Sequence, residues 1–275
     1  MKIWGRNIST TLHSFRINDP YFRGKDRIFR IFRSLTGYPR LTIPYGRGWI
    51  TINEQGEALE RFVWHYGLHE PEVWKALSAL AEKDEVFWDI GANIGTVAIQ
   101  ALLDERVKYV HCFEPNPQII QILEYNLHLN SNIFQVHSLA LSDKISEVDF
   151  YFGGRKQSDI SSLKTNRGFG MLKIITTTID ERIKLGIPAP TLIKIDVEGW
   201  EENVMMGGVR LFQINPPKAV VFEAQCDENT TILNKNIILL LENYGYKINW
   251  IQRASQKLHE FEGVFLENYL AVYTR

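Results

Sequence analysis

The feature that most constrains this chain is an apolar run over 86–90, VFWDI, that breaks directly into a turn bounded by Gly91 and Gly95. Glycine has no Cβ and adopts backbone angles that other residues avoid, so a strand ending in such a turn can bring the backbone close to a ligand. The sequence from Thr96 onward is helix-forming, and the free N–H groups at the start of that helix would face the ligand. The pattern predicts the strand, turn and helix of a nucleotide-cofactor site.

The spacing within this turn distinguishes between cofactors. A pyrophosphate-binding loop, G-x-G-x-x-G, has a middle glycine that lets the backbone approach the phosphates, whereas this chain has Asn93 at that position. Asp89 precedes the first glycine, where its carboxylate would repel a pyrophosphate but would suit a cationic or amino-bearing ligand. S-adenosylmethionine carries an ammonium and a sulfonium, so the turn favours methyl transfer over dinucleotide chemistry.

A second apolar run, Val107–Phe113, ends at Glu114 and is followed by Pro115 and Asn116. An acidic side chain at a strand's carboxyl end, about 20 residues beyond the loop, is where a ribose diol is usually held. We therefore predict that Glu114 binds the ribose of the cofactor. The alternative is a solvent-facing glutamate before a helix that starts at Pro117.

The order of elements predicts the fold class. Apolar strands alternate with amphipathic helices from residue 70 onward, which indicates a mostly parallel sheet with helices on both faces. The closing strands, 246–251 and 270–273, lack an intervening helix and should pair antiparallel. We expect two parts in these 275 residues: a basic arm with a short β-rich extension over 1–68, and the enzyme domain over 69–275.

The composition argues against several classes of protein. A formal net charge of −1 does not favour bulk electrostatic binding to nucleic acid, so no nucleic-acid partner is expected. No apolar run approaches the roughly 20 residues of a membrane span, and the N-terminus lacks the apolar stretch of a signal peptide. Cys112 and Cys226 show no metal-binding spacing, so both are expected to be reduced core residues. We expect a cytoplasmic protein.

Two carboxylates lie at the end of a further apolar strand, 192–197. In such sheets ligands bind beyond the carboxyl ends of the strands, where Asp196 and Glu198 lie and where Gly199 permits a tight exit. Alternation along an extended chain would place both side chains on the same side. Such a pair can share a proton, hold a divalent metal or accept a hydroxyl proton from a substrate, while the alternative is that one of them caps the next helix.

Four motifs in this order resemble the FkbM-type methyltransferases: DIGANIG over 89–95, FEPN over 113–116, ALSD over 140–143 and KIDVEG over 194–199. The resemblance extends roughly over residues 70–274. It implies the class I methyltransferase fold, a Rossmann-like, seven-stranded, mostly parallel sheet with an antiparallel C-terminal strand and helices on both faces. It also implies S-adenosylmethionine as methyl donor, and usually O-methylation of a sugar, a glycan or another small metabolite.

The same resemblance implies roles for individual residues. Asp196 and Glu198 would face the transferring methyl group as the catalytic pair, with or without a divalent metal. The glycine turn would line the methionine end of the cofactor, Glu114 would bind the ribose, and the segment 139–142 would flank the adenine. The predicted cofactor-binding residues are Asp89, Gly91, Ala92, Asn93, Gly95, Glu114, Pro115, Asn116, Leu139, Ala140 and Ser142.

Other functions stay open at this point. Asn215-Pro216-Pro217-Lys218 superficially resembles the N-P-P-aromatic motif of methyltransferases that act on amino nitrogen of nucleic acid or protein, but Lys218 replaces the aromatic residue. A non-catalytic cofactor-binding protein and a dehydrogenase are further alternatives. Ser161 and Ser162 could contact substrate or belong to a solvated loop. His69 could act as a base, although a lone histidine is more often structural.

The N-terminal arm contains a basic amphipathic segment over 26–35. Ile28, Ile31, Phe32 and Leu35 fall at helical spacing, while arginines occupy other positions. Such a helix could contact an anionic membrane surface near a lipid-linked glycan. Packing of its apolar stripe on the enzyme domain or on a partner subunit is the favoured interpretation.

Overall fold

The computed structural model describes residues 40–53, 58–152, 170–227, 229–252, 260–261 and 264–274, together with the isolated residues 31, 34, 37 and 56. The predicted amphipathic helix over 26–35 therefore lies almost entirely outside the described residues, and the serines at 161 and 162 lie outside them too. None of the described helices is long and apolar enough to cross a membrane.

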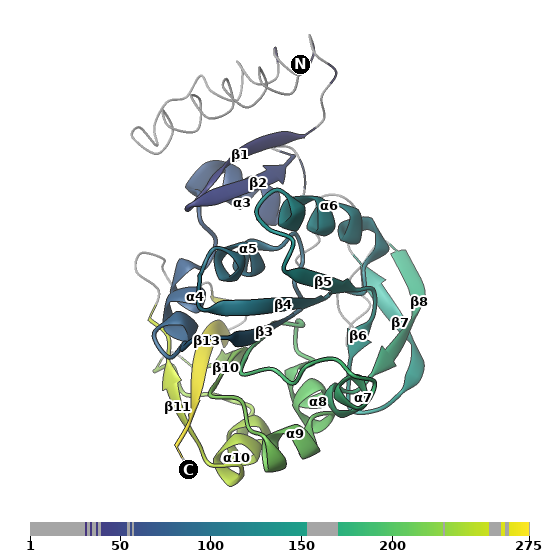
Figure 1. Cartoon of the computed structure of the whole chain (residues 1–275). Coiled ribbons are helices and arrows are strands. Elements are labelled where there is room, and N and C mark those ends of the chain that lie inside the picture. Colours follow the sequence, from purple (N-terminus) through teal and green to yellow (C-terminus); the bar gives the residue numbers. More distant parts are fainter. Residues whose placement is uncertain are drawn as a thin grey trace.

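A seven-stranded sheet forms the centre of the described structure (Figure 1), in the order β11-β13-β10-β9-β3-β4-β5. Neighbours from β10 to β5 run parallel, and β13 is antiparallel to both β10 and β11. The predicted fold class is confirmed, including the antiparallel C-terminal strand. The strands are β3 (Glu85–Ile90), β4 (Val107–Phe113), β5 (Phe134–His137), β9 (Leu192–Ile195), β10 (Ala219–Cys226), β11 (Tyr246–Trp250) and β13 (Val264–Tyr273), and β12 (Glu260–Phe261) pairs with the start of β13.

Helices cover both faces of this sheet because the strands are apolar on both sides. In β3, Phe87 belongs to one hydrophobic core and the next residue, Trp88, to the other, as the two-residue period of a strand requires. On the first face lie α4 (Pro71–Ser78), α5 (Thr96–Leu102) and α6 (Pro117–His128). On the second lie α7 (Ile179–Lys184), α8 (Glu201–Met206), α9 (Val209–Ile214) and α10 (Lys235–Asn243).

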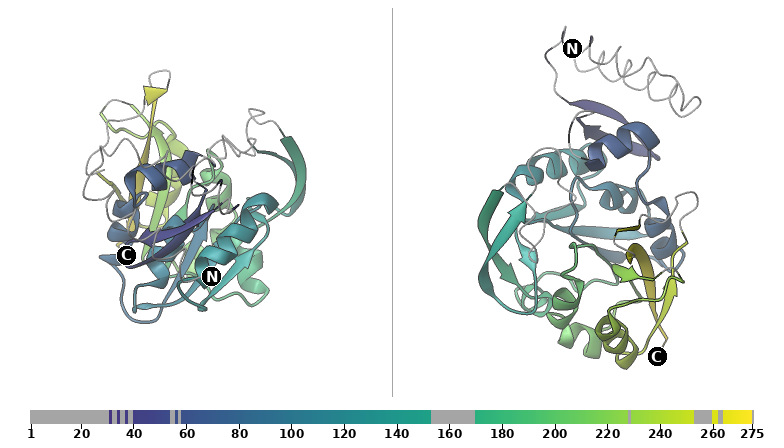
Figure 2. Two further views of the ribbon diagram at one scale, coloured as in Figure 1. Left: turned by 90° about the horizontal axis from the view of Figure 1, so that it is seen from above. Right: turned by 180° about the vertical axis from the view of Figure 1, so that it is seen from behind.

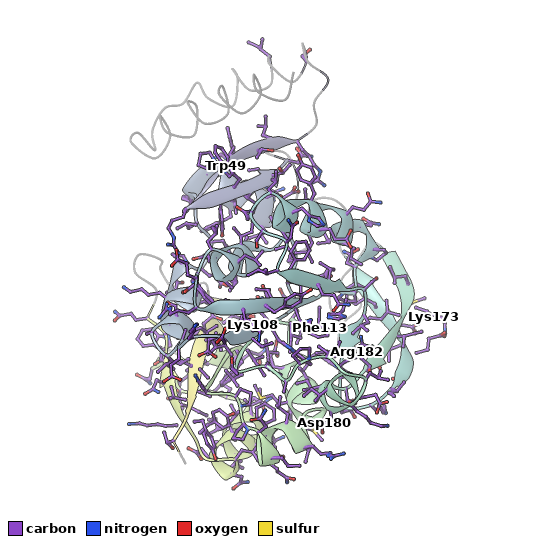
Figure 3. All side chains as sticks on the ribbon, viewed as in Figure 1. Trp49, Lys108, Phe113, Lys173, Asp180 and Arg182 are labelled. Atoms are coloured by element: carbon purple, nitrogen blue, oxygen red, sulfur yellow. The ribbon has the colours of Figure 1, made fainter. Side chains whose placement is uncertain are left out.

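A smaller sheet follows β5 and is built from β6 (Ala140–Leu141), β8 (Gly170–Thr177) and β7 (Ser146–Phe152). β7 and β8 pair antiparallel. They stand at one flank of the molecule in both further views (Figure 2). Lys173 points outward from β8 (Figure 3) and pairs with Glu147 at 2.7 Å.

The N-terminal hairpin, β1 (Leu41–Tyr45) and β2 (Gly48–Ile52), packs against α5 and α6, the helices that cover the first face of the central sheet (Figure 1). The Asn126 side chain of α6 accepts a hydrogen bond from the Thr51 N–H at 2.7 Å, and that of Asn130 accepts one from the Trp49 N–H at 2.8 Å. These two side chains thereby satisfy backbone N–H groups on the open edge of β2. Ile43 and Ile50 share a core with Phe87, and the domain boundary after Leu68 stays a prediction.

The β-rich extension predicted before residue 69 does form strands as far as Ile52, but residues 58–66 are helical and form α3 (Ala58–Tyr66). Leu59 and Val63 are four residues apart and both pack on the first core, which is the spacing of a helix face. Helix α10 begins at Lys235. The side chain of Asn234 caps it by accepting a hydrogen bond from the Asn236 N–H at 3.2 Å.

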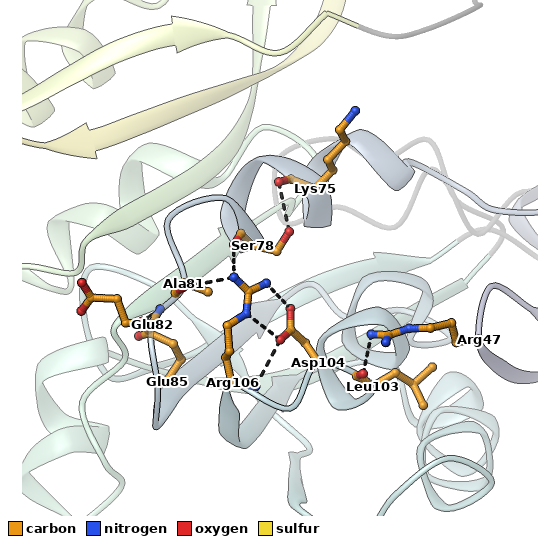
Figure 4. Close-up of polar contacts among 9 residues, drawn as sticks. All are labelled: Arg47, Lys75, Ser78, Ala81, Glu82, Glu85, Leu103, Asp104 and Arg106. Atoms are coloured by element: carbon orange, nitrogen blue, oxygen red, sulfur yellow. Dashed lines mark hydrogen bonds and ion pairs between the residues drawn. The ribbon is translucent and has the colours of Figure 1, made fainter.

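The amino ends of the strands are held by paired charges (Figure 4). Arg106, before β4, donates to both oxygens of Asp104 at 2.9 and 2.7 Å. It also donates to the carbonyls of Ser78 and Ala81, at 2.8 and 3.1 Å, where α4 ends. Lys218, before β10, lies 2.8 Å from Glu85 of β3. These contacts tie the end of α4 and three strands into one rigid edge.

Candidate active site

The glycine turn after β3 is held in an unusual backbone conformation. Gly91, Asn93 and Gly95 have φ of 78°, 47° and 89°, in the left-handed region that glycine and asparagine tolerate best. A Cβ added to Gly91 would lie 1.8 Å from the Asp196 carbonyl oxygen, so only glycine fits where the exits of β3 and β9 touch. The Gly91 N–H also donates to the Phe113 carbonyl at 2.9 Å. The turn thus joins the carboxyl ends of three neighbouring strands.

Asp89 is buried at the end of β3, with 1% of its surface exposed. Neither carboxylate oxygen has a hydrogen-bond partner among the described residues, and the nearest cation is Lys194, whose Nζ lies 3.5 Å from Oδ1. Burial raises the pKa of Asp89, Lys194 opposes that rise and Asp196 adds to it. A buried anion with so few donors is costly for the folded protein unless a ligand completes its shell. The side chain therefore suits an N–H-bearing or cationic ligand.

Lys194 is the cation at the centre of this edge, a role that the sequence motifs did not predict. Its Nζ donates to the Gly91 carbonyl at 2.9 Å and lies 3.1 Å from Asp196 Oδ2. Burial works against its charge, but Asp196 and Asp89 raise the pKa of Lys194 above its ordinary value. A lysine inside the otherwise apolar strand LIKI was the available signal, since a buried lysine needs anionic partners.

Asp196 and Glu198 lie just beyond β9, which ends at Ile195, two residues earlier than predicted. Alternation along a strand therefore does not decide where Glu198 points, because its φ of 54° places it in a left-handed turn. The N-cap residue of α8 is Trp200, whose side chain makes no cap hydrogen bond. Glu201 accepts hydrogen bonds from the Val197 and Gly199 N–H groups, at 3.1 and 3.0 Å. Both carboxylates nonetheless lie close enough to Glu223 of β10 to affect its ionisation.

Glu114 lies at the carboxyl end of β4 and is 7% exposed, so the solvent-facing alternative is wrong. Its Oε2 accepts from the Asn93 N–H at 3.0 Å, and its Oε1 accepts from the Asn116 N–H at 2.8 Å. Each oxygen keeps a further lone pair that could accept a ribose hydroxyl. Burial raises the pKa of Glu114 to about 7, against these amide donors.

The segment predicted to flank an adenine lies beside Glu114 in the structure. The Glu114 N–H donates to the His137 carbonyl at 3.1 Å, and β6 begins three residues later at Ala140. The hydroxyl of Ser142, a buried residue, accepts a hydrogen bond from Trp200 Nε1 at 3.0 Å. The carboxyl ends of β3, β4, β5 and β9 therefore lie next to one another, and the predicted cofactor-binding residues lie along this edge of the sheet.

Three further candidates are placed differently. Asn215–Pro217 precede β10 at the amino edge of the sheet, away from the carboxylates, so the N-P-P motif has no place in this site. His69 Nδ1 lies 3.8 Å from Glu70 Oε2, and the His69 N–H donates to the Tyr45 hydroxyl at 3.1 Å. In the part of the chain that the structure describes, no group of three or more His, Cys, Asp or Glu side chains is arranged to hold a metal ion.

Comparisons with known proteins bear on this site. Residues 89–248 match the family model described as the methyltransferase FkbM domain. The chain is 31% identical over 147 residues to hexuronic acid methyltransferase AglP of Haloferax volcanii, a match that covers 52% of this chain and 58% of that protein. The chain thus spans little more than half the length of this curated relative.

Two solved structures are similar in fold. The putative transferase PH0793 of Pyrococcus horikoshii is 12% identical, with a TM-score of 0.51 over 92% of this chain and 84% of that chain. The methyltransferase FkbM of Methylobacillus flagellatus KT is 20% identical, with a TM-score of 0.47 over 78% of this chain and 53% of that chain.

Proposed function

Because this chain belongs to the FkbM methyltransferase family, we propose that it transfers a methyl group from S-adenosylmethionine to a hydroxyl group of a sugar or a related small molecule. The observation that carries the proposal is Asp89, a buried carboxylate with no hydrogen-bond partner among the described residues. It lies next to a turn whose spacing disfavours a pyrophosphate. An ammonium-bearing ligand supplies the donors that Asp89 lacks.

The described residues fit this cofactor at both ends. Asp89 and the turn over 91–95 would hold the methionine end, Glu114 the ribose hydroxyls, and the segment 139–142 the adenine. The Asn93 side-chain oxygen is a further buried acceptor without a hydrogen-bond partner in the described structure. When bound, the cofactor supplies an electrophilic methyl group.

Orienting and deprotonating the acceptor hydroxyl are the tasks of the protein's own side chains. A neutral hydroxyl is a poor nucleophile, so the site must orient it toward the methyl group and remove its proton. Asp196 and Glu198 lie at the edge where an acceptor would bind, and Lys194 holds Asp196 in position. We assign this pair to the reacting centre, where it faces the transferring methyl group. A divalent metal held by the pair could activate the hydroxyl as well, and turnover measured with and without EDTA tests for such a metal.

The relative from Haloferax volcanii is named for hexuronic acid, so uronic acids are the first acceptors to test. The described rim is rich in carboxylates, which would repel an anionic sugar at close range. Each uronic acid should therefore be tested beside its neutral parent sugar. The difference between the two shows whether the acid group is recognised or merely tolerated.

Two measurements test the proposal. S-adenosylhomocysteine should raise the melting temperature of the protein and NAD should not, because only the former presents an ammonium to Asp89. Methyl-labelled cofactor incubated with the acceptor panel should give a product whose mass is increased by one labelled methyl group. Stabilisation by NAD alone would replace the proposal with a dinucleotide-dependent function.

A further inference from the structure

Polar side chains form a row across four strands on the face of the sheet that carries α4. Asp89 of β3 is in register with Lys194 of β9, and Lys194 is in register with Val221 of β10. Glu223, two residues after Val221, therefore points to the same face and lies next to the exit of β9. On its other side Glu223 is in register with Asn268 of β13. The row lies near the carboxyl ends of the parallel strands, and ligands in such folds bind just beyond those ends.

The start of α4 contacts this row at its β13 end. Asn268 Nδ2 donates to Glu70 Oε1 at 2.9 Å, a contact between residues 198 positions apart. Glu70 is the N-cap residue of α4 and has a left-handed backbone, with φ of 45°. Asn268 thus donates a hydrogen bond to one carboxylate, Glu70, and is the strand neighbour of a second, Glu223.

The charged groups that surround Glu223 in the described structure are mostly carboxylates. Carboxylates approach it from α4 (Glu70), from the turn after β9 (Asp196 and Glu198) and from α8 (Glu201). The ammonium of Lys194 is already engaged by Asp196 and Asp89. Burial and these four carboxylates raise the pKa of Glu223 well above its ordinary value. In the ligand-free protein this carboxyl group therefore holds its proton at pH values where an exposed glutamate has lost it.

We propose that Glu223 is the group that takes the acceptor's hydroxyl proton, and that it becomes ionised only when a sulfonium-bearing cofactor binds beside it. The inference rests on the proposed function. In the reaction, the acceptor oxygen bonds the methyl carbon, the carbon–sulfur bond breaks with its electron pair going to sulfur, and the hydroxyl proton moves to the Glu223 carboxylate. The proton then leaves to solvent.

Electrostatics favour Glu223 over Asp196 for this role. Asp196 is already engaged by the Lys194 ammonium, whose Nζ lies 3.1 Å from Oδ2. Glu223 faces other carboxylates, which make it a stronger base than an ordinary glutamate once it is ionised. A positive charge that arrives nearby favours the ionised form and drives its proton to solvent. The site would then have its base ready only when the methyl donor is bound.

Proton release on ligand binding tests this inference without any acceptor. Calorimetric titrations with S-adenosylmethionine and S-adenosylhomocysteine, in buffers of different ionisation enthalpy at pH 7, count the protons released by each. Both ligands carry the ammonium and the ribose, so Asp89 and Glu114 affect both counts equally. Only S-adenosylmethionine carries the sulfonium, and we expect it to release more protons, by up to about one per site.

Variants of the protein show which residue releases the additional proton. Glu223→Gln should abolish the difference between the two ligands while its affinity for S-adenosylhomocysteine stays within about threefold of wild type. Glu85→Gln is the matched control, because Glu85 is a buried glutamate at the opposite edge of the same sheet and should leave the difference intact. Equal release for both ligands overturns the inference, as does a difference that persists in Glu223→Gln but vanishes in Asp196→Asn. Failure of both ligands to bind would instead remove the proposed function.

Discussion

The two edges of the central sheet carry the same kinds of charged residue in opposite states. At the amino edge, the hydrogen bonds from Arg106 hold the pKa of Asp104 below its ordinary value. Lys218 does the same for Glu85, although burial opposes it. At the carboxyl edge, burial raises the pKa of Asp89 and of Glu223. Identical chemical groups are thus stabilised as ions at one edge and destabilised as ions at the other.

The difference follows from the number of donors near each carboxylate. Asp104 receives two hydrogen bonds from one guanidinium, whereas neither oxygen of Asp89 receives one within the described residues. Carboxylates that accept their full set of hydrogen bonds stabilise the fold. Carboxylates that lack such partners lower its stability but remain able to bind a ligand. Substitutions at the two edges should therefore change different properties of the protein.

The largest effect should come from Gly91→Val. A valine side chain would enter the space of the Asp196 carbonyl, and the φ of 78° at this position disfavours any β-branched residue. The turn and the exit of β9 must then shift together, which displaces Asp89 and Asp196 at once. We expect affinity for S-adenosylhomocysteine to fall by about 100-fold or more, measured by calorimetry. Wild-type affinity in this variant would show that the turn is not part of the cofactor site.

An intermediate effect, and the sharpest test of the comparison, comes from one substitution made at each edge. Asp89→Asn should weaken cofactor binding about tenfold or more, because a neutral amide attracts a cation less strongly. It should change stability little, since the ionised carboxylate is already unfavourable there. Asp104→Asn should leave cofactor affinity unchanged and should lower the free energy of unfolding by about 1 kcal/mol, because it weakens a partly exposed ion pair.

Urea denaturation and calorimetry on both variants give the four numbers needed. A loss of stability in Asp89→Asn equal to that in Asp104→Asn would mean that Asp89 is a structural residue like its counterpart. The two edges would then differ only in the ionisation of their carboxylates, without a difference in role.

Much of the fold could be predicted because it depends on local pattern. The apolar runs at 86–90 and 107–113 and the turns that end them are contiguous, and β3 and β4 formed as expected. The elements of the N-terminal region were harder. Residues 58–66 are helical because their apolar face packs on a core built largely from residues further along the chain.

The site was predictable where a motif is contiguous and was missed where it depends on register. Asp89, Glu114 and Asp196 belong to short motifs and meet at one edge, as predicted. Glu223 lies inside the strand AVVFEAQC, and its importance appears only when β10 is placed next to β9. The contact of Asn268 with Glu70 spans most of the chain. No local pattern predicts such pairings, because strand order is set by packing of the whole sheet.

The smallest effect concerns the ionisation of Glu114, whose pKa is about 7 in the ligand-free protein. The folded state binds this proton more tightly than the unfolded chain, so the group's stabilising contribution is complete at low pH. That contribution is lost as the pH rises from the unfolded value, about 4.5, through 7.

Ribose hydroxyls that donate to the carboxylate favour its charged form, so S-adenosylhomocysteine should lower the pKa of Glu114. Carboxyl ¹³C NMR should show titration near pH 7 without ligand and clearly lower with it. If the ligand leaves the pKa of Glu114 unchanged, the ribose lies elsewhere along the edge, and the carboxylate belongs with the structural charges despite its position.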